Sequence, residues 1–283
     1  MTKTKILIEP EELKALLTTG NIILVDTRSR EDYEISHITG AVNIPDIFTY
    51  LASSSERGVK DMREFLANKF GEAGINSAQQ VVFYEQDMRG GFGQSCRGHF
   101  ILSYLGNDTS YVLHGGLDAW TKAGLPVTSA RTNITSVAFE LSDKGKHLMV
   151  SKDDVLSELH QNRITLLDVR DVDEWIGESS SPYGKDFSPR KGRIPGAKWL
   201  EWHRMMKPNG LIKSPDEVRA ECLNAGIDFS KPIWLYCFKG SRTSNTYVAL
   251  KQAGFSDIST YFGSWNEWSR DDTLPIETGM PDR

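Results

Sequence analysis

The stretch Ile233-Trp234-Leu235-Tyr236-Cys237-Phe238-Lys239-Gly240-Ser241-Arg242 runs from an apolar segment into a short polar turn. A helix-compatible run follows from Thr243 to Ala253, and Gly254 ends it. The apolar segment is typical of a buried strand, and the glycine permits a tight turn before the helix. The stretch therefore predicts a strand, a turn and a helix, with Cys237 placed over the helix N-terminus.

This position suits a reactive cysteine. At a helix N-terminus the backbone N–H groups converge and the helix dipole favours negative charge, so the nucleophilic thiolate is favoured there. The competing interpretation is inert packing, because cysteine is among the residue types most often buried. Two cations within five residues, Lys239 and Arg242, make little sense in an apolar core and would hold an anionic substrate. The loop therefore favours a reactive sulfur.

The length and the net charge of the chain favour a two-domain protein and argue against a nucleic-acid-binding protein. The 283 residues exceed what one typical compact core needs and suit two domains. The net charge of -5, with no basic stripe, gives no support to nucleic-acid binding. The charged N-terminal segment, whose apolar run breaks at Glu9, is unlike a signal peptide, and no segment is long enough to span a bilayer. We expect no nucleic-acid partner and no membrane contact.

The three cysteines, Cys96, Cys222 and Cys237, are too widely spaced for a disulfide framework or a zinc site. Thiols that stay reduced fit a reducing compartment, so we expect a cytoplasmic location. We expect Cys96 to lie on a helix and to be structural.

The two halves of the chain repeat four segments in the same order, at a spacing the size of a whole domain. The matched pairs are Leu24–Arg28 with Leu167–Arg170, His37–Ala41 with Arg193–Ala197, Val81–Glu85 with Ile233–Cys237, and His114–Trp120 with Tyr261–Trp268. A period of this size indicates duplication of one domain rather than a solenoid.

Within each half, short apolar strands alternate with amphipathic helices, which predicts an α/β fold with a mostly parallel sheet flanked by helices. The expected strands are Ile22–Asp26, Val81–Tyr84, Tyr111–Leu113, Ile164–Asp168, Ile233–Tyr236 and Ile258–Tyr261. The other expected helices are Pro10–Leu17, Val59–Lys69, Gly98–Leu105, Lys152–Gln161 with Ser151 as its N-cap, and Ser214–Asn224. We expect an N-terminal domain over 1–130, a linker over 131–147 and a C-terminal domain over 148–283.

Together these motifs resemble the rhodanese family, specifically its two-domain thiosulfate and 3-mercaptopyruvate sulfurtransferases, over essentially the whole chain. The resemblance is strongest in the Asp-x-Arg after the first strand of each half, the His/Arg-Ile-x-Gly-Ala segments, the cysteine loop and Tyr261–Trp268. In that family the second domain carries a cysteine that becomes a persulfide, and the first domain is catalytically inactive. The matching positions are Cys237 and Glu85. Since a carboxylate cannot carry a sulfane sulfur, we expect the first domain to be inactive.

The resemblance implies a double displacement without a metal or an organic cofactor. The Cys237 thiolate would attack the outer sulfur of thiosulfate, sulfite would leave, and a persulfide would remain. Cyanide or a thiol, which could belong to a thioredoxin-like protein, would then remove the sulfur. Backbone amides of residues 238–242 would stabilise the negative charge of the persulfide.

The expected catalytic residue is Cys237, and the expected substrate-binding residues are Phe238, Lys239, Gly240, Ser241, Arg242 and Arg193. Thiosulfate-type relatives resemble Cys-Arg-Lys-Gly-Val-Thr in this loop and 3-mercaptopyruvate types resemble Cys-Gly-Ser-Gly-Val-Thr. Because Lys239 and Gly240 match the first pattern, we expect thiosulfate to be the preferred donor. However, Glu174 aligns with the family's substrate-binding arginine. Another cation must therefore substitute, either Arg242 or one of the cluster Arg190, Lys191 and Arg193, or the donor differs.

Three other functions remain open. The chain could be a 3-mercaptopyruvate sulfurtransferase, or a persulfide carrier that delivers sulfur to a partner protein. The third is phosphatase or arsenate-reductase chemistry, and a phosphatase loop needs five residues between cysteine and arginine. Here four residues separate Cys237 from Arg242, and Thr243 stands at the phosphatase position. A loop of this length suits a sulfur atom better than a phosphate group.

Overall fold

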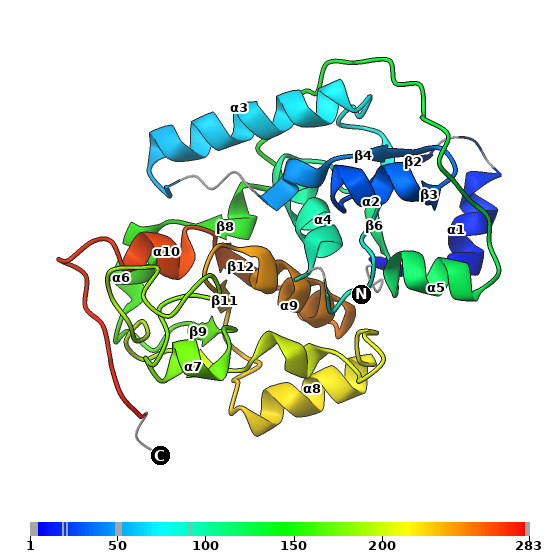
Figure 1. The fold of residues 1–283 in the computed structure, drawn as a ribbon. Helices are drawn as coiled ribbons and strands as arrows, with labels where there is room; N and C mark the ends of the chain where they lie inside the picture. The colour runs from blue at the N-terminus through cyan, green and yellow to red at the C-terminus, as the bar shows by residue number, and fades with distance from the viewer. Residues whose placement is uncertain (1–4, 19, 21, 49–52, 91, 281–283) are drawn as a thin grey trace. The chain divides into compact units, whose positions relative to one another are not determined.

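The computed structural model describes residues 5–18, 20, 22–48, 53–90 and 92–280 (Figure 1). The chain divides into two compact units. The first comprises the described parts of 1–50, 60–147 and 206–212, and the second the described parts of 51–59, 148–205 and 213–283. Among the described residues, no helix combines the length and apolar character needed to cross a membrane.

The first unit is built on a five-stranded parallel sheet with the strand order β1-β6-β5-β2-β4. Its strands are β1 (Leu7–Ile8), β2 (Ile22–Asp26), β4 (Ala41–Asn43), β5 (Gln80–Tyr84) and β6 (Ser110–Leu113). The short strands β3 (His37–Ile38) and β7 (Val127–Thr128) pair antiparallel. The helices are α1 (Pro10–Leu17), α2 (Arg30–Ile35), α3 (Glu56–Glu72), α4 (Gln94–Tyr104) and α5 (Gly116–Lys122).

The second unit repeats this architecture with the strand order β10-β9-β11-β12-β8, again all parallel. Its strands are β8 (Met149–Val150), β9 (Thr165–Asp168), β10 (Lys198–Trp199), β11 (Ile233–Tyr236) and β12 (Ile258–Tyr261). Its helices are α6 (Lys152–Glu158), α7 (Val172–Trp175), α8 (Pro215–Asn224), α9 (Ser241–Gln252) and α10 (Ser264–Trp268). The 3₁₀ helices are η1 (Pro45–Phe48), η2 (Lys146–Leu148) and η3 (Trp202–Met205). The expected α/β fold, with two similar units that each hold a mostly parallel sheet flanked by helices, is confirmed.

The central strands are continuous apolar runs because helices cover both faces of each parallel sheet. In the first unit, a buried core joins strand, helix and turn residues: Ile8, Leu13, Leu24, Tyr33, Ile38, Ala41, Val82, Tyr84, Leu113, Leu117, Trp120 and Leu125. The core of the second unit comprises Val155, Leu166, Ile194, Tyr236, Phe238, Tyr261, Trp265, Trp268 and Leu274. Because Phe238 belongs to this core, packing anchors the cysteine loop to the sheet.

Element boundaries follow local turn chemistry. Helix α4 begins at Gln94, earlier than expected, because Gly93 adopts a left-handed conformation (φ +77°) that turns the chain into the helix. Helix α6 ends at Glu158, earlier than the expected Gln161, because Leu159 is already extended and His160 has a positive φ of 64°. Ser151 caps α6 as expected and accepts a hydrogen bond from the Asp154 N–H at 3.1 Å.

The Asp-x-Arg motif braces the turn after the second strand of each sheet in the same way. Asp168 accepts hydrogen bonds from the Arg170 backbone N–H at 3.0 Å and from its Nη2 at 2.6 Å, and Arg170 also donates to the Gly192 carbonyl. In the first unit, Asp26 accepts from the Arg28 N–H at 2.9 Å and from its Nη2 at 2.7 Å. Burial disfavours the charged form of Arg170, but the Asp168 carboxylate outweighs it and raises the pKa of the guanidinium. We therefore interpret the Asp168–Arg170 pair as a structural brace of this turn.

Candidate active site

The cysteine loop lies between the end of β11 and the start of α9. Gly240 is the N-cap of α9 with a left-handed φ of +85°, and a Cβ there would stand 2.7 Å from the Phe262 ring. Only glycine meets both conditions without strain. The turn brings the Gly240 N–H to 3.0 Å from Cys237 Sγ, to which it donates a hydrogen bond. A sulfur that accepts an N–H at a helix N-terminus is stabilised when it carries negative charge.

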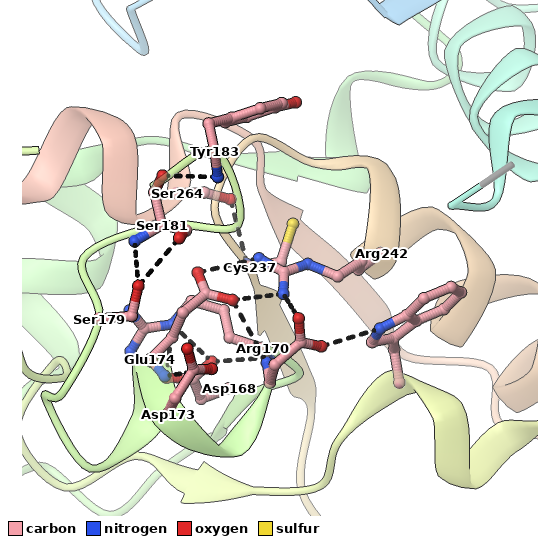
Figure 2. A network of polar contacts seen from close by, with 12 residues as sticks. Asp168, Arg170, Asp173, Glu174, Ser179, Ser181, Tyr183, Cys237, Arg242 and Ser264 are labelled. Carbon is pink, nitrogen blue, oxygen red and sulfur yellow. Dashed lines mark hydrogen bonds and ion pairs between the residues drawn. The ribbon is translucent and has the colours of Figure 1, made fainter. Parts of the chain in front are cut away.

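The start of α10 holds the strand end that carries Cys237. The Cys237 N–H donates to Ser264 Oγ at 3.2 Å (Figure 2), and that hydroxyl donates to the Tyr261 carbonyl at 2.8 Å. The carbonyls of Cys237 and Phe238 accept from the N–H groups of Trp265 and Asn266, both at 3.0 Å. These bonds fix the loop before any substrate arrives.

The hydroxyls of the first α9 turn fix the other end of the loop. Thr243 Oγ1 and Ser244 Oγ donate to the Gly240 carbonyl at 2.9 and 2.7 Å. Ser241, the first residue of α9, is half-buried. Among the predicted loop residues, Gly240 donates to the sulfur, and Phe238, Lys239, Ser241 and Arg242 flank Gly240 along the chain.

The other two cysteines have different surroundings. Cys96 lies on α4 as expected and Cys222 lies on α8; both are buried, and no disulfide joins any of the three cysteines. Burial raises the pKa of the Cys222 thiol to about 12, and burial together with the charge of Glu85 raises that of Cys96. Both thiols are therefore disfavoured as nucleophiles.

Arg242 is buried and paired with two carboxylates. Its Nη1 lies close to Glu174 Oε2 and 3.1 Å from Asp171 Oδ2, and its Nη2 donates to Glu174 Oε1 at 3.0 Å (Figure 2). Burial disfavours the charged guanidinium, but Glu174 outweighs burial and raises the pKa of Arg242. Sequence reasoning missed this pair because the partners lie 68 positions apart.

The acidic partners of Arg242 belong to the start of α7. Asp171 and Glu174 form a capping box there, and the Trp202 indole N–H donates to Asp171 Oδ1 at 3.1 Å. Asp171, Asp173 and Glu174 place carboxylate oxygens within 4.8 Å of one another, a spacing that a cation could use. Since the Arg242 guanidinium already pairs with Asp171 and Glu174, we interpret these carboxylates as ion-pair partners of Arg242.

Lys239 lies against an aromatic cluster formed by Tyr183, Phe187 and Phe238. Its Nζ stands 4.8 Å from the centroid of the Tyr183 ring and 5.6 Å from those of Phe187 and Phe238. The Tyr183 and Phe238 rings meet edge to face at 5.6 Å. Cation–π contact holds the ammonium beside the rings without cancelling its charge. The loop around Tyr183 therefore fixes the direction of the Lys239 side chain, two residues after Cys237.

Arg193 is engaged by the C-terminal segment. Its guanidinium donates to Glu277 Oε2 at 3.2 Å and to the Gly279 carbonyl at 2.7 Å, and it stacks over the Trp175 ring at 4.7 Å. The neighbouring Arg190 donates to main-chain carbonyls, among them that of Leu274 at 2.8 Å. These contacts brace the C-terminal segment and are separate from the hydrogen bonds of the cysteine loop.

The equivalent position of the first unit holds a carboxyl side chain, that of Glu85. Glu85 follows β5 as Cys237 follows β11, and its carbonyl accepts from the Leu117 N–H at 2.9 Å. Its carboxylate accepts from Ser95 Oγ at 2.6 Å and from the Gln94 N–H at 3.1 Å, so it caps the N-terminus of α4. Burial raises the pKa of Glu85 to about 7. A carboxylate thus occupies the place that the sulfur takes in the second unit.

We expect Glu85 to make the stability of the protein depend on pH. Because its folded pKa exceeds the unfolded value, the folded chain binds more protons, and stability falls as pH rises from about 4.5 to above 7. The fall amounts to about 2 to 3 kcal/mol between about pH 5 and pH 8. Urea denaturation of the intact chain at both pH values should show that Glu85→Gln removes this fall. Glu31→Gln, at an exposed position on α2, should retain it; an unchanged fall in Glu85→Gln would contradict the assignment.

Comparisons with known proteins agree with the duplicated fold. A family model described as a rhodanese-like domain matches the chain twice, over residues 9–123 and 151–271. The thiosulfate sulfurtransferase of Azotobacter vinelandii is 30% identical over 96% of this chain and 97% of its own length. The sulfur carrier protein TtuD of Thermus thermophilus is 28% identical over 96% of this chain and 93% of its own length.

Solved structures of similar fold also concern sulfur chemistry. The anaerobic ergothioneine biosynthesis enzyme from Chlorobium limicola, in complex with trimethyl histidine, superposes with a TM-score of 0.85 at 25% identity, covering 97% of this chain and 70% of the enzyme. An EanB variant with a cysteine persulfide, in a tetrahedral intermediate state with ergothioneine, superposes with a TM-score of 0.86 at 26% identity, covering 97% and 71%.

Proposed function

Because this chain belongs to the rhodanese family and is a sulfurtransferase of that family, we propose that it moves a sulfane sulfur from thiosulfate to a thiophilic acceptor through a persulfide on Cys237. The observation that carries the proposal is the Gly240 N–H at 3.0 Å from Cys237 Sγ, at the N-terminus of α9. This N–H favours a thiolate before the reaction and a persulfide anion after it.

The reaction proceeds in two displacements. The Cys237 thiolate attacks the outer sulfur of thiosulfate, a new S–S bond forms, and the old S–S bond breaks as sulfite leaves with its electron pair. A thiolate or cyanide then attacks the outer sulfur of the persulfide, and Cys237 regains its thiolate. The backbone N–H groups of residues 238–242 stabilise the negative charge at each stage.

The loop residues have distinct roles in this proposal. Lys239 supplies the positive charge for the donor, and the aromatic cluster orients it. Gly240 supplies the N–H for the sulfur, while Phe238 anchors the loop in the core. Arg242 forms the buried ion pair with Glu174. Arg193 holds the C-terminal segment through its hydrogen bond to the Gly279 carbonyl.

A second candidate is a persulfide carrier that delivers sulfur to a thiol of a partner protein. The similarity to the sulfur carrier of Thermus thermophilus, over nearly the full length of both chains, favours it. Such a carrier would hold the persulfide stably and turn over slowly with cyanide. The same Cys237 chemistry serves both functions, so they differ in the acceptor.

Steady-state kinetics with two donors separate these functions. The protein is incubated with cyanide and either thiosulfate or 3-mercaptopyruvate, and thiocyanate is measured. We expect a higher kcat/KM with thiosulfate, because Lys239 matches the thiosulfate-type loop. A higher kcat/KM with 3-mercaptopyruvate would make that compound, and not thiosulfate, the donor. A stable persulfide that reacts slowly with cyanide would favour the carrier function. Hydrolysis of an aryl phosphate would instead indicate the phosphatase.

A further inference from the structure

We propose that Glu174 is a specificity-determining residue that limits how tightly the site binds a doubly charged donor, because it neutralises Arg242. This inference rests on the proposed function, in which Cys237 receives sulfur from a small anionic donor. Glu174 occupies the position at which the family resemblance predicts an arginine that binds the donor.

The first step is the location of Arg242. It lies in the first turn of α9, two residues after Gly240, whose N–H donates to the Cys237 sulfur. Its guanidinium pairs with Glu174, so the buried ion pair is anchored in the first turn of α9. The charge of the Arg242 ion pair therefore acts on whatever approaches the nucleophile.

The second step is the balance of charge. Glu174 and Asp171 are both paired with Arg242, and the side chains of Glu174 and Arg242 are only 1% and 3% exposed. The neighbouring buried charges of Asp168 and Arg170 balance each other, so Asp171, Glu174 and the more exposed Asp173 against the guanidinium of Arg242 leave this group net negative. Water screens the buried charges of Glu174 and Arg242 weakly and that of Asp171, which is 31% exposed, more strongly, so the net charge acts at short range.

The third step is the charge of the donor. Thiosulfate carries two negative charges, whereas 3-mercaptopyruvate carries one on its carboxylate. A net negative group beside the nucleophile repels the dianion about twice as strongly as the monoanion, because Coulomb energy is proportional to charge. Neutralising Glu174 should therefore help thiosulfate more than 3-mercaptopyruvate.

The test is Glu174→Gln. Glutamine keeps the size of the side chain and an amide oxygen that can accept from Arg242, while it removes one negative charge. We expect the KM for thiosulfate to fall roughly three- to tenfold and the KM for 3-mercaptopyruvate to fall clearly less. The matched control is Glu178→Gln, an exposed carboxylate paired with Lys185 at 3.7 Å, which should leave both KM values unchanged.

An unchanged KM for thiosulfate in Glu174→Gln, or an equal fall for both donors, would overturn the inference. If Glu174→Gln fails to fold, Asp171→Asn removes the other carboxylate, keeps a residue that can cap α7, and should lower the thiosulfate KM in the same direction. The proposed function is tested separately by the wild type. If the wild type acquires sulfur on Cys237 while the KM of neither variant falls, only this inference fails.

Discussion

Replacing Cys237 with serine should lower sulfurtransferase turnover by at least about 10³-fold while the fold remains intact. A serine hydroxyl can accept the Gly240 N–H as the sulfur does, so the loop keeps its hydrogen bond. It cannot form a persulfide, and a neutral hydroxyl is a weak nucleophile at neutral pH. The loss therefore concerns chemistry and not structure.

Thiocyanate formation from thiosulfate and cyanide measures the loss, and circular dichroism checks the fold. The matched control is Cys222→Ala, which removes a buried thiol of α8 and should retain turnover in the range of the wild type. Turnover by Cys237→Ser comparable to that of the control would mean that another group carries the sulfur.

Arg242→Met should lower the free energy of unfolding of the second unit by about 3–5 kcal/mol, because it strands the buried Glu174 carboxylate without its partner. The cost comes from the uncompensated charge more than from the lost contact. The double variant Arg242→Met with Glu174→Met should therefore recover much of the stability, since it removes both charges from the interior.

Tryptophan fluorescence during urea denaturation follows this unit well, because six of the seven tryptophans lie in its half of the chain: Trp175, Trp199, Trp202, Trp234, Trp265 and Trp268. The control is Arg219→Met on α8, whose pair with Asp216 is exposed and should contribute less than about 1 kcal/mol. A double variant as unstable as Arg242→Met alone would show that the stranded charge is not the cause.

The local features of the fold could be predicted from sequence because they depend on neighbouring residues. Helix α1 and strands β2, β11 and β12 have the predicted bounds, since each is an uninterrupted apolar or amphipathic run between clear breakers. The four repeated segments also indicated a duplicated domain, which the matching strand orders of the two sheets confirm.

The charge pairing of the site could not be predicted, because it depends on contacts between distant segments. Glu174 follows β9 and Arg242 follows β11, and the parallel pairing of these two strands brings the two side chains together. The same holds for Lys239 and Tyr183, which come together through a loop without regular structure. Sequence showed which charges were present, and only the fold shows which of them compensate one another.

Intact-mass spectrometry tests the central claim most directly. After incubation with thiosulfate and removal of the donor, the wild type should gain the mass of one sulfur atom, which peptide mapping places on Cys237 and which cyanide removes. Cys237→Ser should gain nothing. A wild type without added sulfur, or added sulfur that persists in Cys237→Ser, would contradict the account.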